Sequence, residues 1–215
     1  MTTPIHRYID AAILKPELTP AQAEAEIRAM VDCNVFAIFV RPADIPLALR
    51  LCNGSDTAVG TVLSFPHGCG HPDVKAREAE AYISLGVAEI DMVVNYGLVR
   101  AGDWDAVRND ISVVTRVAGP AGRPVKVILE TSELELDAIA GATEAAIAAG
   151  ADYVKTSTGF ASGGATVDAV QTMLDAARGR IKVKASGGIR DAATAAQFIA
   201  MGCHRLGIGS SSTPA

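Results

Sequence analysis

The feature that most constrains the fold is a regular alternation of two kinds of segment along the chain. Short apolar runs rich in β-branched residues, which are typical of strands, alternate with longer alanine-rich stretches of helical periodicity. Because parallel strands need long crossover connections, this alternation predicts a parallel sheet joined by helices. The strand-like runs are residues 8–14, 35–40, 58–64, 89–94, 125–130, 153–157, 181–185 and 204–208.

The number of runs separates two α/β folds. Eight strands favour a closed (β/α)₈ or TIM barrel, whereas a doubly wound sheet more often has about five or six. No GxGxxG motif follows the first run, so a dinucleotide-binding fold lacks its main sequence support. The helical segments are residues 20–33, 42–51, 72–85, 104–117, 136–149, 166–177 and 192–201.

Chain length limits how complete the barrel can be. Such barrels typically have about 250 residues and a lower limit near about 200. The 215 residues are therefore expected to form a single domain spanning residues 1–215. Because only residues 209–215 follow the last run, the eighth helix is predicted to be missing or truncated, which opens the helix ring beside the active-site end.

Composition excludes several classes of partner. The formal charge is -5, with 19 basic and 24 acidic residues and no basic cluster, so no nucleic-acid partner is expected. No apolar run approaches the roughly 18 residues of a membrane span. Four cysteines without a visible secretory signal indicate free thiols in a reducing compartment, which predicts a cytoplasmic location.

Charged side chains occur in strands that should end at the active-site face of the barrel. Barrel chemistry takes place at the carboxyl ends of the strands, and strand side chains alternate between axis and helices. This alternation predicts that Asp91, Lys155 and Lys184 all face the barrel axis. Lys126 belongs to the strand between those of Asp91 and Lys155. A buried ion-pair network without function is the alternative interpretation.

Two neighbouring lysines have a specific chemical use. A lysine must be neutral to attack a carbonyl, and a second ammonium about 4 Å away lowers its pKa by roughly three units at an effective dielectric near 20. Lys155 beside Lys184 fits an imine-forming lysine, with Asp91 as the proton-transfer group. Lys182 shares the orientation of Lys184, but it lies deeper in its strand and lacks the glycines that follow Lys184.

Glycine-rich loops follow the last three strands. Exposed backbone N–H groups after the seventh and eighth strands often bind phosphate in barrel enzymes, so these loops predict a phosphorylated substrate. The segment His67, Cys69 and His71 contains only three candidate metal ligands with no evident fourth, so no metal site is expected there.

Three motifs resemble one enzyme family. VKTSTGF at residues 154–160, VKASGGIR at 183–190 and EIDMV at 89–93 together resemble the deoxyribose-phosphate aldolases, over nearly the whole chain. The resemblance implies a class I aldolase that reversibly cleaves 2-deoxy-D-ribose 5-phosphate to D-glyceraldehyde 3-phosphate and acetaldehyde. It also implies no metal or cofactor, and a homodimer or larger homo-oligomer.

The resemblance also implies individual roles. Lys155 forms the imine, Lys184 lowers its pKa and shuttles protons, and Asp91 donates and accepts protons. The implied substrate-binding residues are Asp10 and Lys126 as supporting polar groups and Gly159, Gly187, Gly188, Gly207 and Ser210 in the phosphate loops.

Three departures from the family pattern bear on the substrate. Ala11 and Ala12 replace a polar pair, Phe39 stands where cysteine is common and adds bulk near the substrate channel, and Gly209 replaces a serine. They leave open a related imine-forming barrel aldolase that acts on a different aldehyde or phosphosugar. The non-enzyme alternative is a barrel with structural lysines, or a binding protein that holds a metal in the segment from His67 to His71.

Overall fold

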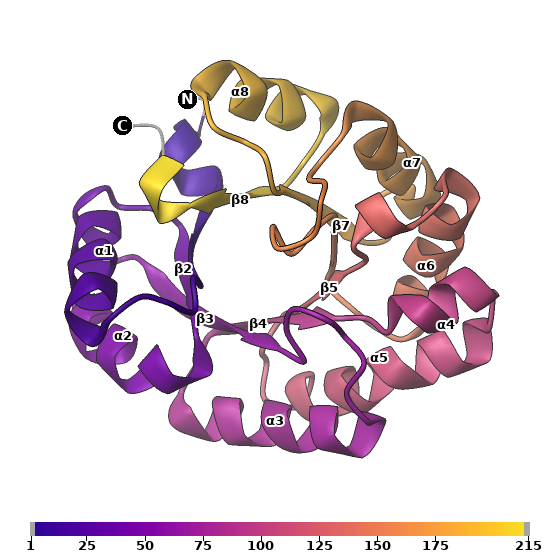
Figure 1. The fold of residues 1–215 in the computed structure, drawn as a ribbon, viewed down its shortest axis with the longest axis horizontal. Coiled ribbons are helices and arrows are strands. Elements are labelled where there is room, and N and C mark those ends of the chain that lie inside the picture. Colours follow the sequence, from indigo (N-terminus) through magenta and orange to yellow (C-terminus); the bar gives the residue numbers. More distant parts are fainter. Residues whose placement is uncertain (1–2, 213–215) are drawn as a thin grey trace.

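The computed structural model describes residues 3–212 and contains a closed barrel of parallel strands (Figure 1). Each strand pairs with the next along the chain, and the last pairs with the first, so the sheet has no free edge. This confirms the predicted (β/α)₈ fold. The strands are β1 (Ile9–Ile13), β2 (Ala37–Val40), β3 (Ala58–Leu63), β4 (Glu89–Val93), β5 (Val125–Ile128), β6 (Tyr153–Lys155), β7 (Lys182–Ser186) and β8 (Arg205–Gly209).

Helices surround the barrel on the outside (Figure 1). Local sequence fixes the ends of several helices: Thr19 and Gln22 form a capping box at the start of the first helix, and Gly202 ends the last one in the left-handed conformation, with φ of 112°. The helices are α1 (Pro20–Asp32), α2 (Ile45–Cys52), α3 (Pro72–Leu85), α4 (Tyr96–Ala101), α5 (Trp104–Ala118), α6 (Leu136–Ala148), α7 (Val167–Ala177) and α8 (Ala192–Met201).

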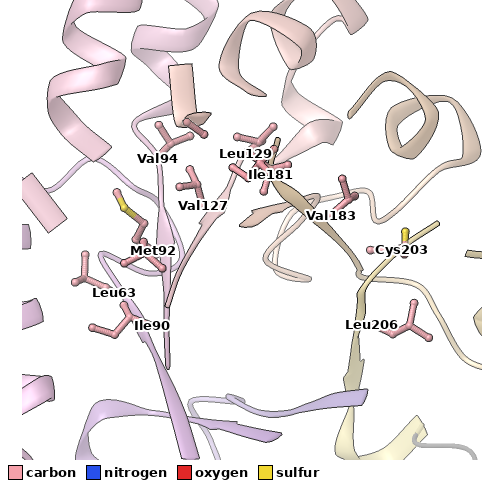
Figure 2. Close-up of a cluster of buried hydrophobic side chains, with 14 of the residues drawn as sticks. Leu63, Ile90, Met92, Val94, Val127, Leu129, Ile181, Val183, Cys203 and Leu206 are labelled. Carbon is pink, nitrogen blue, oxygen red and sulfur yellow. The ribbon is translucent and has the colours of Figure 1, made fainter. Parts of the chain in front are cut away.

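The strand register divides the side chains into two sets. Residues facing the helices are apolar and form a continuous hydrophobic layer, part of which Figure 2 shows; it includes Ile90, Val183 and Leu206, each fully shielded from solvent. The alternate residues face the barrel axis and are largely polar or small. The barrel is therefore held from outside by hydrophobic burial, which leaves its interior free for charged groups.

The structure differs from the sequence prediction at several boundaries. The six-residue helix α4 was not predicted, because so short a segment shows no clear helical periodicity. Residues 42–44 form a 3₁₀ turn before α2. Strand β5 ends two residues early, because Glu130 adopts a left-handed conformation with φ of 58° and turns the chain.

Beyond β8, residues 210–212 form a single 3₁₀ turn in place of a helix (Figure 1). The helix that was expected to be missing or truncated is the one that would follow β8, not α8, which lies between β7 and β8. Up to residue 212 the structure agrees with this expectation, and residues 213–215 lie outside the described part. None of the helices within residues 3–212 is long and apolar enough to cross a membrane.

Candidate active site

The register brings the expected charged residues together inside the barrel. Asp91 on β4 is the partner of Lys126 on β5, and Lys155 on β6 is the partner of Lys184 on β7. The ends of β6 and β7 are tied by Thr156, whose Oγ1 donates to the Ser186 carbonyl at 2.8 Å and accepts from the Ser186 N–H at 2.9 Å. This pair of hydrogen bonds holds the two lysine-bearing strands side by side.

Asp91 lies at the centre of the charged group. Its Oδ2 accepts hydrogen bonds from Lys155 Nζ at 2.9 Å and from Lys184 Nζ at 2.8 Å, while its Oδ1 accepts from Lys126 Nζ at 3.1 Å. Because Lys155 and Lys184 share one oxygen, their nitrogens lie within two hydrogen-bond lengths of each other. The predicted lysine pair and its carboxylate therefore form one contiguous cluster.

Two further carboxylates complete the cluster below Asp91. Asp10 on β1 contacts Lys184 Nζ through Oδ2 at 2.6 Å and Arg205 through Oδ1 at 3.1 Å. Glu89, at the start of β4, forms a close ion pair with Lys126. Arg205 and Glu89 were not identified from the sequence, and their place in strands with inward charged neighbours was the signal that could have revealed them.

The cluster holds more positive than negative charge. Within the described chain it joins four cationic side chains to three carboxylates, with every member almost fully buried; they are Lys126, Lys155, Lys184, Arg205, Asp10, Glu89 and Asp91. One cation is therefore left without a carboxylate of its own. A buried group in that position is stabilised by losing its proton.

Lys155 is the group that bears this excess. Burial lowers its pKa to about 8; attraction to Asp91 opposes the shift, and repulsion from Lys184 and Lys126 adds to it. From the sequence, the lowered pKa was attributed to the neighbouring ammonium of Lys184, but burial of Lys155 contributes more to it. In Lys126 burial also lowers the pKa, but attraction to Asp91, Asp10 and Glu89 outweighs it and the pKa is raised.

Asp91 and Asp10 are held as anions. Burial raises the pKa of Asp91, but the attraction of Lys126, Lys155 and Lys184 outweighs it and keeps the pKa well below the usual range. Asp10 behaves in the same way: burial raises its pKa, while Lys184, Lys126 and Arg205 lower it by a larger amount. Both side chains are thus carboxylate anions at neutral pH.

A cavity of about 320 Å³ opens at the ends of β1, β7 and β8. Four of the predicted substrate-binding residues line it: Gly159, Gly187, Gly188 and Gly207. Its wall also contains two cations, Lys15 and Arg190, one acidic residue, Glu17, and Thr158, none of which was singled out from the sequence. Gly187 and Gly188 have φ of 87° and 77°, so consecutive left-handed residues turn this loop, a conformation that favours glycine.

Three other predicted binding residues lie elsewhere. Asp10 and Lys126 are buried in the charged cluster and do not line the cavity. Ser210 donates its hydroxyl to Glu26 on α1, so the structure does not bring this side chain to the cavity. Gly209 and Ser212 line the cavity at this point of the chain.

The departures from the family pattern have different surroundings. Ala11 is fully buried in the layer facing the helices, so only Ala12 lines the cavity. Phe39 does not line the cavity; its ring centroid lies 4.3 Å from Lys126 Nζ and 4.2 Å from Lys184 Nζ, inside the barrel. The neighbouring Gly60 makes room for it, since a Cβ there would lie 2.5 Å from the ring.

The other candidates from the sequence, Lys182 as an alternative to Lys184 and the segment from His67 to His71 as a metal site, do not belong to the charged cluster. Lys182 is exposed, and its Nζ lies 5.2 Å from the ring centroid of Tyr153 near the opposite end of the barrel. His71 caps α3 by accepting a hydrogen bond from the Asp73 N–H at 3.2 Å. Within residues 3–212 no group of three or more His, Cys, Asp or Glu side chains is arranged to hold a metal ion.

Lys155 does not itself line the cavity, but Gly207, which does, lies beside Lys184 of the same cluster. A buried amine with a lowered pKa, in a cluster that adjoins a cavity at the carboxyl end of the strands, is the arrangement of a TIM-barrel enzyme built around a reactive lysine. Comparison with known proteins agrees with this class. Residues 10–208 match the model of the DeoC/LacD family aldolases. The chain therefore belongs to the DeoC/LacD family of aldolases.

Individual relatives cover the chain almost completely. A deoxyribose-phosphate aldolase of Coprothermobacter proteolyticus is 43% identical over 206 residues, which is 96% of this chain and 93% of the relative. The solved aldolase QR15 superposes with a TM-score of 0.91 at 36% identity, covering 97% of this chain and 93% of its own. The deoxyribose phosphate aldolase of Aeropyrum pernix, described as a unique tetramer, gives 0.88 at 28% identity, with 96% and 87% covered.

Proposed function

We propose that this protein is a class I aldolase that reversibly cleaves 2-deoxy-D-ribose 5-phosphate to D-glyceraldehyde 3-phosphate and acetaldehyde. One observation carries the proposal: Asp91 Oδ2 contacts the nitrogens of both Lys155 and Lys184 inside the barrel. In these buried surroundings the pKa of Lys155 is lowered to about 8. With that pKa, about a tenth of Lys155 is neutral at pH 7, against fewer than roughly one in a thousand for an ordinary lysine.

The first half of the reaction forms the imine. The neutral Lys155 nitrogen attacks the C1 aldehyde carbon of the open-chain sugar, and loss of water from the carbinolamine leaves a protonated imine. Lys184 supplies a proton to the departing hydroxyl, and Asp91, which contacts both nitrogens, accepts and returns protons between steps.

The second half breaks the carbon–carbon bond. The C3 hydroxyl gives its proton to Asp91, its electrons form the new aldehyde carbonyl, and the C2–C3 bond breaks with its electron pair flowing into the imine. Glyceraldehyde 3-phosphate leaves, and the enamine on Lys155 takes a proton at C2. Hydrolysis of the resulting imine releases acetaldehyde and restores the free amine.

The cavity supports a phosphorylated substrate. Lys15 and Arg190 outnumber the one acidic residue of its wall, Glu17. Gly187 and Gly188 form the turn after β7, where barrel enzymes often bind phosphate. The names of the relatives point to the same sugar phosphate. We therefore place the phosphate in the cavity, with the aldehyde end directed toward Lys155.

Borohydride reduction in the presence of acetaldehyde tests the reaction type. We expect the imine to be trapped as an N-ethyl group on Lys155, located by peptide mass spectrometry, while Lys126 and Lys182 stay unmodified. An unmodified Lys155 would overturn the proposal. An adduct on Lys155 without cleavage of 2-deoxyribose 5-phosphate would favour the alternative, an imine-forming aldolase for a different phosphosugar.

Assembly, domain organisation and location are further parts of the proposal. The tetramer of the Aeropyrum pernix relative supports a homo-oligomer. The match over residues 10–208 supports one catalytic domain. The four free cysteines favour a reducing compartment, so we propose a cytoplasmic enzyme.

A further inference from the structure

Glu130 is a buried carboxylate that the lysine mechanism does not use. It is 2% exposed, follows β5, and has a left-handed backbone with φ of 58°, which is unfavourable for a residue other than glycine. Among the described residues it forms no ion pair within 4.0 Å, although it lies near Lys155. A buried charge on strained backbone is costly unless the site benefits from it.

All hydrogen bonds of the Glu130 carboxylate within the described chain come from one residue, Thr158. The Thr158 hydroxyl donates to Oε2, and the Thr158 N–H donates to both carboxylate oxygens at 3.3 Å. Burial raises the pKa of Glu130, while the bonds from Thr158 and the attraction of Lys155 oppose the rise. Because the Thr158 N–H donates to both carboxylate oxygens, Oε1 and Oε2 act as acceptors, and the Thr158 hydroxyl directs its proton to Oε2.

Thr158 is placed between the reactive lysine and the phosphate loops. It lies three residues after Lys155, and it lines the cavity beside Gly159. Its oxygen accepts a hydrogen bond from the Phe160 N–H at 3.0 Å, while its proton is committed to Glu130. A hydroxyl oxygen has two lone pairs, so one remains for a donor from the ligand.

We propose that Glu130 is a positioning residue that holds Thr158 as a hydrogen-bond acceptor for a hydroxyl group of the sugar phosphate. The hydroxyl concerned is the one between the reacting carbon and the phosphate, which is the C2 hydroxyl of the acceptor aldehyde in the direction of synthesis. This inference rests on the proposed function, because it assumes that Lys155 and the cavity bind opposite ends of one substrate.

The test compares two acceptor aldehydes that differ in that hydroxyl alone. D-glyceraldehyde 3-phosphate carries it and 3-oxopropyl phosphate lacks it, and both are condensed with acetaldehyde. The wild-type enzyme should prefer the hydroxylated acceptor in kcat/KM. The variant Glu130→Gln, whose amide can also donate to Thr158, should lose about tenfold of that preference, the value of one hydrogen bond of about 1.4 kcal/mol.

Two further variants make the result specific. Thr158→Val keeps the N–H bonds to Glu130 but removes the hydroxyl, so it should lose the same preference even if Glu130→Gln folds poorly. The double variant should lose no more than either single variant, because both act through one contact. Glu135→Gln is the matched control: this glutamate is exposed, caps no N–H of α6 with its side chain, and should leave the preference unchanged.

The ratio of the two acceptors separates positioning from structural damage, which would lower both rates together. A wild-type enzyme without preference for the hydroxylated acceptor would overturn the inference. So would a preference that survives in Glu130→Gln or Thr158→Val. If wild-type Lys155 is not trapped with acetaldehyde, the proposed function itself fails, and that result is independent of Glu130.

Discussion

Replacing Lys155 with methionine should abolish the aldolase activity and stabilise the fold. Methionine fills much of the space of the lysine stem but carries no charge. The pKa of Lys155 lies at about 8 against 10.5 for an ordinary lysine, so holding the charged form in the native state at pH 7 costs about 3 kcal/mol, at 1.36 kcal/mol per pKa unit. The side chain is 5% exposed, so solvent screening reduces this cost little.

The pH dependence of the gain identifies its cause. Below pH 8 both folded and unfolded chains carry the Lys155 proton, and the wild-type protein bears the full cost. Between pH 8 and 10.5 the unfolded chain binds more protons than the native one, so the contribution of Lys155 to wild-type stability rises with pH and the advantage of Lys155→Met disappears. Urea unfolding of both proteins at pH 7 and pH 10 measures this difference.

Lys126→Met is the control with the opposite sign. Lys126 is fully buried and contacts Asp91, Asp10 and Glu89, and these carboxylates raise its pKa. Removing its charge should destabilise the protein by about 3–5 kcal/mol, because buried carboxylates lose their partner. The reasoning is refuted if Lys155→Met is no more stable than wild type at pH 7, or if its advantage persists unchanged at pH 10.

Three further predictions concern the rate, the packing and the cavity. Imine formation with acetaldehyde should speed up as pH rises toward 8 and then level off. Lys184→Leu should slow it by about 100-fold or more at pH 7, chiefly because the variant lacks the proposed proton donor to the departing hydroxyl. Stopped-flow trapping that shows a flat pH profile or a near-normal variant contradicts the assigned roles. Gly60→Ala should cost about 1–3 kcal/mol in urea unfolding, because the new Cβ would lie 2.5 Å from the Phe39 ring, and adding Phe39→Leu should recover part of that loss; additive effects would exclude the contact. Arg190→Ala should raise KM for 2-deoxyribose 5-phosphate about tenfold but not that for unphosphorylated 2-deoxyribose, and an equal change in both assays would place the phosphate elsewhere.

The periodicity of apolar residues in strands and helices predicts most of the fold, because the same pattern repeats along the chain. The inward direction of Asp91, Lys155 and Lys184 also followed from local alternation, since one residue of shift reverses every side chain in a strand. Helix α4 and the early end of β5 were not predicted from the sequence. Each involves only a few residues, whose backbone conformation depends on their neighbours in the folded structure.

The chemistry proposed for the lysine pair follows from the sequence, but the main cause of the lowered pKa of Lys155 does not. The sequence by itself determined the barrel, the inward lysines and the glycine loops, because these depend on residue type and spacing. Only the tertiary structure decided that Arg205 and Glu89 join the cluster, that Ser210 bonds Glu26 and that Glu130 holds Thr158. Such contacts join residues far apart in the chain, and burial, which contributes most to the lowered pKa of Lys155, exists only once the barrel has closed.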